Sequence, residues 1–432
     1  MITDIFYSFI IITFIVFGFS RPYVALAAVL WIDTVKPQNT SFSFLSGKPL
    51  SLILTAFFLL TLLVNAKKLR KVNNGAFYVL FFGFMLWITL SHLNAEFPLY
   101  SAIKYDTAIK TLFILFFIPF TISTKKDFDF VLSILYAASS LFITIGGIKS
   151  AMGGGGYGIS LIGLQGSGFM YSEGSMLATL AVCLIPLSLY LAHYSFLSNK
   201  KIFRYYCYLV VFCALTTQVG TQARTGVVVL GVYVLLHLYY TKKKLKGVAF
   251  LMVLAVIGSQ FVTDGWLKRM ETIDQGTTTE KSAVGRIVVW RWAFDYVADR
   301  PILGGGFYAY LANAGKLDQY GQEGEVVISQ GGAKAYHNIY IEVLAETGYG
   351  GLLIFLGIIV HTLLLNSKKP NPNDPWSTES SKAIKTFTLL YCAGGMFINV
   401  AFYPWIYILY TLSVAKNSIS SKQVNEEKES RY

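Results

Sequence analysis

Apolar runs that approach the ~20 residues a helix needs to cross a bilayer recur along the whole chain. The sequence is 54% hydrophobic and only 14% charged, and its mean hydropathy is +0.54. A soluble domain carries about a quarter charged residues. These features argue against a soluble protein and against a single membrane anchor. We predict an all-α polytopic membrane protein with about 12–13 transmembrane helices.

The apolar periodicity places each predicted span between polar or glycine-containing segments, and the first two can pair as a short hairpin around Arg21 and Pro22. The predicted spans lie near 3–20, 23–37, 50–66, 76–92, 107–123, 128–147, 174–194, 205–220, 225–240, 247–263, 339–366, 384–401 and 403–416.

The formal net charge of +13 is concentrated in short lysine-rich clusters between the spans. The clusters occupy 67–71, 124–128, 199–204, 241–247 and 367–370. Such clusters are typical of cytoplasmic loops under the positive-inside rule, so their placement favours a membrane topology over nucleic-acid binding. The segments then expected outside are 38–49, 93–106, 148–173, 217–224 and 264–338.

The segment 264–338 is the longest predicted outer loop and contains a helix-like pattern at 281–301. Apolar residues recur there at helical spacing, at Ile287, Trp290, Phe294 and Val297. We predict an amphipathic helix that lies on the outer membrane face and ends before a proline. The following stretch, 304–335, is expected to form a mobile lid or groove wall. The glycine run at 146–168 lacks the ending of a nucleotide P-loop and predicts a flexible outer loop.

Several cationic side chains fall at outer ends of predicted spans, where the positive-inside rule makes them uncommon. They are Arg224 in GTQARTG, Arg286 and Arg291 on the predicted loop helix, Lys104 and Lys110 on another span, and His337 after the long loop. Ionisable groups at the membrane boundary are candidates for function, although a single arginine at a span end commonly snorkels to lipid headgroups.

The residue types suggest one chemistry. Arginine binds phosphate oxygens through two parallel hydrogen bonds, so we predict that Arg224, Arg286, Arg291 and Lys110 bind a diphosphate. A histidine with an ordinary pKa near 6.5 is suited to accept a proton at neutral pH, which predicts His337 as the base. His92 is the rival, since it is the other histidine expected outside.

Asn338, Glu342 and Glu346 are four residues apart and share one helix face. They form either a solvated first turn or a set in which Glu342 orients His337 or contacts an acceptor. Gln222, near Arg224, is a further candidate for support. No ligand spacing for a metal is visible, so we expect metal-independent chemistry without a cofactor. Buried packing is expected for the cysteines, namely Cys183, Cys207, Cys213 and Cys392.

The chain resembles the superfamily of O-antigen ligases, O-antigen polymerases and bacterial O-linked oligosaccharyltransferases. Three stretches carry the resemblance: TQARTG, GRIVVWRWAFDYVADRPILGGGF and YHNIYIEVLAETGYGGL. The stretch SRPYVALAAVLWIDTVKPQ is similar to a subgroup of exosortase-associated O-glycosylation ligases. That subgroup often has an acidic-Asn-Asn run where this chain reads YSEGSML with Glu173.

The resemblance implies a GT-C-type fold and inverting transfer of a glycan from an undecaprenyl-diphosphate-linked donor to an acceptor hydroxyl. The family histidine would be His337, and its essential arginines would be Arg224 and Arg286. The acceptor would be a glycolipid, another glycan, or a serine or threonine of a protein. The expected location is the bacterial inner membrane, with the site facing the periplasm.

The expected organisation has three parts. They are N-terminal transmembrane helices at 1–147, an O-antigen-ligase-like catalytic membrane domain at 148–416 that includes the loop 264–338, and a disordered cytoplasmic tail at 417–432. A polymerase of the same superfamily is an alternative function. A transporter of lipid-linked glycans is an alternative of another class, but it would be expected to carry charges deep in its central spans.

Overall fold

The computed structural model describes residues 2–156, 158–162, 173–241, 281–321, 332–367 and 373–429, with 245, 248 and 252 as single residues. Over these residues the fold is helical and contains no strand. The predicted span 247–263 and most of the lysine cluster 241–247 lie outside the described part of the chain.

The first half of the chain forms helices that follow the predicted apolar runs. They are α1 (Ile2–Gly18), α2 (Pro22–Val35), α3 (Pro37–Thr40), α4 (Leu50–Val64), η1 (Ala66–Lys68), α5 (Gly75–Leu93), α6 (Pro98–Phe116), α7 (Ile118–Thr121), α8 (Lys125–Ala151) and α9 (Gly174–Tyr194). Helix α6 begins well before the predicted span 107–123, because Pro98 occupies its first turn, where a missing N–H costs nothing.

The second half supplies the remaining described helices. They are α10 (Lys201–Thr221), α11 (Arg224–Tyr240), α14 (Lys281–Ala298), η2 (Ala309–Asn313), η3 (Leu317–Tyr320), α15 (Ile339–Leu365), α16 (Pro375–Gly395) and α17 (Trp405–Glu429). Helix α17 continues beyond Lys416, so the expectation of a disordered tail is wrong for 417–429. Its extension is held where the Asn417 amide donates to the Leu365 carbonyl at 3.0 Å and the Arg70 guanidinium donates to the Ser418 carbonyl.

Within the described residues, five helices are long and apolar enough to cross a membrane, namely α5, α8, α9, α10 and α15. Shorter apolar helices are α1, α4 and α11. The chain is therefore an all-α polytopic membrane protein. Small residues let some helices approach closely, as expected inside a bilayer. A Cβ added to Gly147 of α8 would lie 2.4 Å from the Cβ of Cys213 on α10.

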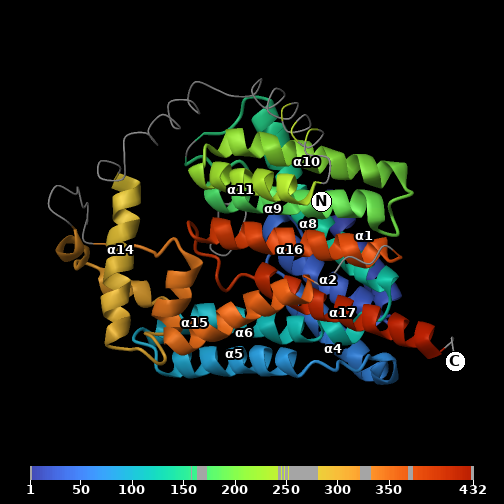
Figure 1. The fold of residues 1–432 in the computed structure, drawn as a ribbon, viewed down its shortest axis with the longest axis horizontal. Coiled ribbons are helices and arrows are strands. Elements are labelled where there is room, and N and C mark those ends of the chain that lie inside the picture. Colours follow the sequence, from blue (N-terminus) through green and yellow to red (C-terminus); the bar gives the residue numbers. More distant parts are fainter. Residues whose placement is uncertain are drawn as a thin grey trace.

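One helix departs from the common direction of the bundle. Figure 1 shows α5, α10, α16 and α17 running along the length of the molecule, whereas α14 runs across one end. We call this end of the bundle the α14 end. The N-terminal part of α15 packs against α14 there, and the loop between α5 and α6 reaches α14 through the hydroxyl of Tyr296, which donates to Glu96 Oε2 at 2.5 Å.

Helix α14 confirms the predicted loop helix, but its buried face differs from the expected one. Val284, Val288 and Trp292 are buried against the rest of the protein, together with Tyr296 and Val297. Of the four residues that suggested the helix, only Val297 is buried, and Phe294 is 52% exposed. The reason is that α14 carries apolar residues on two faces, and the face that packs on α15 is the one with the valines.

The expectation of a mobile lid over 304–335 is wrong for 304–321, which is packed. Phe307, Ala309 and Leu317 are each at most 1% exposed. Residues 322–331 lie outside the described part. The start of the glycine run is also held in place, since the Gly156 N–H donates to the Gly220 carbonyl at 2.9 Å.

Helix α15 is broken at Gly348, whose backbone has φ 69° and ψ −173°. The break removes the helical partners of the carbonyl groups just before it, and other donors replace them. These donors are the Gly305 N–H to Ala345 at 2.9 Å, the Gly306 N–H to Glu346 at 3.0 Å, and the Trp87 indole N–H to Thr347 at 2.9 Å. The break therefore divides α15 into a short segment, Ile339–Thr347, and a long apolar segment.

We predict that Gly348→Ala destabilises the protein. The backbone conformation of Gly348 is essentially restricted to glycine, and such conformations cost other residues about 1–3 kcal/mol. The added Cβ would also lie only 2.2 Å from the Ile302 carbonyl oxygen. Thermal unfolding of the detergent-solubilised protein should show a lower Tm. Gly83→Ala on α5 is the control, because nothing lies within 4 Å of its Cβ position. Equal Tm values for the two variants would contradict this account of the break.

We also predict that the α14 end faces out of the cell. A cysteine at Asp318, which is exposed beside α14, should react with an impermeant maleimide added to intact cells. A cysteine at Lys201, exposed at the start of α10, should react only after the cells are opened. Maleimide labelling of the native cysteines should be low, because Cys183, Cys207 and Cys213 are buried. Labelling of position 318 from the cytoplasm alone would reverse the orientation.

Candidate functional site

The α14 end contains a buried cluster of charges. Lys104 Nζ of α6 lies 2.7 Å from Glu342 Oε1 and 2.6 Å from Glu346 Oε2, both on the short segment of α15. The side chains of Lys104, Glu342 and Glu346 are 19%, 5% and 1% exposed. Two carboxylates share one ammonium group. We call Lys104, Glu342 and Glu346 the charge cluster.

Backbone groups and aromatic rings complete the charge cluster. The Ala401 N–H donates to Glu342 Oε2 at 3.1 Å, and the Tyr308 N–H donates to Glu346 Oε1 at 3.0 Å. The ammonium of Lys104 lies 4.8 Å from the ring centre of Phe402, an arrangement that favours a cation. The possibility of a solvated first turn is therefore wrong for Glu342 and Glu346. Their shared helix face was visible in the sequence, but their common partner on α6 was not.

His337 lies just before α15 in a conformation that is uncommon for residues other than glycine, with φ 48°. The chain on both sides of it is held. The Trp290 indole N–H donates to the Tyr336 carbonyl at 2.8 Å, and Asn338 Oδ1 accepts from the Tyr340 N–H at 2.9 Å. Asn338 therefore caps α15, and the His337 side chain is exposed. Strained conformations of this kind often occur at functional sites.

The surroundings of His337 favour its neutral form. The protein atoms around the ring and the nearby positive charge of Arg286 lower its pKa from the ordinary value, and Glu173 and Glu342 oppose this effect. The ring reaches solvent at one side, yet enough protein surrounds it for the charged form to be disfavoured. His337 thus lies near charges from α14, from the start of α9 and from α15, and it is neutral and able to accept a proton at pH 7.

Glu173 is a site neighbour that the sequence did not single out as a candidate. Its carboxylate accepts hydrogen bonds from the Ser175 and Met176 N–H groups at 3.0 and 2.9 Å and so caps α9. The proximity of Glu173 to His337 depends on the fold and is not visible in the sequence.

The arginines of the predicted diphosphate site have different environments. Arg224 is half-buried and begins α11, two residues after Gln222, which caps the end of α10 with φ 50°. Arg286 is half-buried on α14 and lies close enough to His337 to affect its pKa. Arg291 Nη1 donates to the Tyr320 carbonyl at 3.2 Å, which ties α14 to η3.

Lys110 and His92 have partners of their own. Lys110 lies 2.6 Å from Asp106, and the two side chains are 72% and 59% exposed. Asp106 therefore offsets the positive charge of Lys110 on an exposed face of α6. His92 Nδ1 lies 2.8 Å from Ser101 Oγ, and its ring stacks on Tyr105 with centroids 4.3 Å apart. His92 is packed between α5 and α6, in contrast to the exposed ring of His337.

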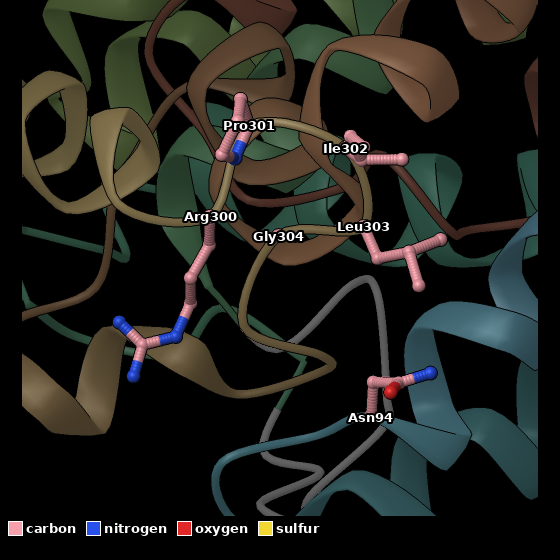
Figure 2. A pocket seen from close by; sticks show the side chains of 6 residues that line it. All are labelled: Asn94, Arg300, Pro301, Ile302, Leu303 and Gly304. Carbon is pink, nitrogen blue, oxygen red and sulfur yellow. The ribbon is translucent and has the colours of Figure 1, made fainter.

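A shallow hollow of about 300 Å³ lies beside the end of α14 and is lined by Asn94 and residues 300–304. Figure 2 shows the Arg300 side chain pointing away from Ile302 and Leu303. The Arg300 guanidinium lies 3.1 Å from Glu96 and 4.7 Å from the Tyr296 ring centre. Because Arg300 already has these partners and His337 does not line the hollow, we do not regard it as the reaction site.

Comparison with known proteins divides the chain into two regions. Residues 209–356 match a family described as O-Antigen ligase. Residues 2–196 match a family of unknown function (DUF5935). No curated protein matches the chain. The candidate residues come from both regions, since Lys104 and Glu173 belong to the first in sequence, and Arg224, Arg286, His337, Glu342 and Glu346 to the second.

Proposed function

We propose that this chain, whose residues 209–356 match the O-antigen ligase family, transfers a glycan from an undecaprenyl-diphosphate-linked donor to an acceptor hydroxyl. The observation that best supports this proposal is the setting of His337. Its ring is exposed at the α14 end, its backbone is fixed on both sides, and Arg286 is near enough to lower its pKa. A neutral base therefore lies close to a cation that suits a phosphate.

In this proposal His337 takes the proton of the acceptor hydroxyl as its oxygen attacks the anomeric carbon. The bond between the anomeric carbon and the diphosphate oxygen breaks, and the lipid diphosphate leaves with the electron pair. Attack from the opposite side inverts the configuration at that carbon. Arg224 and Arg286 stabilise the charge that develops on the leaving diphosphate. Lys110 is left out of this role, because it pairs with Asp106 on an exposed face.

The supporting residues have narrower parts in the proposal. Asn338 and Gln222 shape the backbone next to His337 and Arg224, since Asn338 caps α15 and Gln222 ends α10. Arg291 holds α14 against η3. Glu342 contributes through its ion pair with Lys104 in the charge cluster. We place the site on the periplasmic face of the bacterial inner membrane, in a GT-C-type arrangement that acts without a metal or cofactor.

The direct test uses the purified full-length protein with a lipid-linked oligosaccharide. Candidate acceptors are a lipid A core glycolipid, a free glycan and a protein rich in serine and threonine. Release of lipid diphosphate that depends on an acceptor, with the glycan joined to that acceptor, is the expected result, and EDTA should leave the rate unchanged. Elongation of the donor glycan itself would indicate a polymerase. Donor binding without any product would indicate a transporter and would refute the transfer reaction.

A further inference from the structure

The charge cluster does more than join two helices. It brings two carboxyl groups and one ammonium group together in a buried setting. Buried charges are costly unless they are paired and hydrogen-bonded. Here Glu342 and Glu346 each bind Lys104, and each also accepts from a backbone N–H, those of Ala401 and Tyr308. The cluster is therefore a built arrangement that fixes its members in one geometry.

The charge cluster holds the short segment of α15, which follows His337 and Asn338 in the chain. The break at Gly348 separates Ile339–Thr347 from the long part of α15, so helix continuity alone does not fix its orientation. Both glutamates lie on this short segment, and Lys104 attaches it to α6. Because His337 is only two residues ahead of Ile339, a rotation of the segment would carry the imidazole with it.

The charges that face His337 come from several elements. Arg286 lies on α14, Glu173 lies just before α9, and Glu342 lies on α15. Glu346 shares the same lysine and the same helix face as Glu342 but lies one helical turn farther from His337 along α15. Glu342 therefore belongs both to the cluster and to the surroundings of the base, which connects the two.

We propose that Lys104 is a positioning residue which, by holding Glu342 and Glu346, fixes the short segment of α15 that follows His337 and keeps the Glu342 charge near the imidazole. This inference rests on the proposed function, since it concerns the base of that reaction. It assigns a role to a residue from the N-terminal region, which matches a family of unknown function. Lys104 has no contact with the reacting atoms in this proposal.

The first arm of the test measures kcat, KM and donor affinity for Lys104→Met and Lys104→Arg. Misplacing a reacting group by about 1 Å can cost ~100-fold in rate. We expect Lys104→Met to lose about that factor in kcat with little change in donor affinity, and Lys104→Arg to restore part of it. Wild-type kcat in Lys104→Met would overturn the inference.

The second arm does not depend on whether Lys104→Met folds. Glu342→Gln keeps the size of the side chain but removes a negative charge beside His337. The acidic limb of its rate profile should therefore move to lower pH. Glu346→Gln is the matched control, and its limb should stay at the wild-type pH. An acidic limb that does not move in Glu342→Gln would overturn the inference, and so would equal shifts of the limb in both variants. Neither result would contradict transfer by the wild type. Absence of transfer by the wild type would instead refute the proposed function.

Discussion

His337→Ala should bind the lipid-linked donor normally and transfer its glycan about a hundred to ten thousand times more slowly than the wild type. The reason is that the arginines, and not the histidine, hold the diphosphate, whereas one positioned base contributes a factor of this size to the chemical step. Single-turnover transfer and equilibrium donor binding, measured on the same purified preparation, separate the two effects.

His92→Ala is the matched control, since His92 also lies at the α14 end but is packed against Ser101 and Tyr105. It should retain transfer. If His92→Ala abolished transfer and His337→Ala retained it, the base would be misassigned. If His337→Ala lost donor binding and not chemistry, the histidine would be a diphosphate ligand.

The pH dependence provides an independent measurement on the wild-type protein. The pKa of His337 lies below its ordinary value, because of the surrounding protein atoms and Arg286. The base is active in its neutral form, so transfer should be constant near pH 7 and fall only as pH drops below the ordinary histidine value of about 6.5. His337→Ala should lack this acidic limb. A limb that begins above pH 7 would contradict the environment described for the ring.

Arg224→Lys should reduce transfer by about a hundredfold or more while the protein still folds. Lysine keeps the positive charge but loses the two parallel donors that match a phosphate, and removing one preorganised donor from a developing anion typically costs ~10²–10³ in rate. Expression, size-exclusion behaviour and thermal unfolding should match the wild type, and initial rates with the lipid-linked donor give the loss.

Arg300→Lys is the control for this change. Arg300 is 40% exposed and pairs with Glu96, so a lysine can replace it with little effect on transfer. Similar activity in the Arg224 and Arg300 variants would show that Arg224 only reaches toward lipid headgroups.

Local sequence predicted the longer described helices of this fold but not the short helices α3, α7, η1, η2 and η3. Apolar runs of bilayer length predicted most of the described helices, because a chain in hydrocarbon must satisfy its backbone groups within each segment. The helix predicted within 281–301 was also readable, since its apolar residues repeat every three or four positions, and it ends at Ala298, shortly before Pro301. The buried face of that helix was not readable, because α14 carries apolar side chains on more than one side and only its packing on α15 selects between them.

The candidate site shows the same division. The sequence was enough to single out His337, Arg224 and Arg286 as candidates at the ends of predicted spans, since residue type and distance from the spans are local properties. Tertiary structure alone decided that Lys104 binds Glu342 and Glu346, more than two hundred residues away in the chain, and that Glu173 approaches His337. It likewise decided that Lys110 pairs with Asp106 on an open face. Such pairings depend on how separate helices pack. The periodicity of one segment does not specify which residues of another segment it will contact.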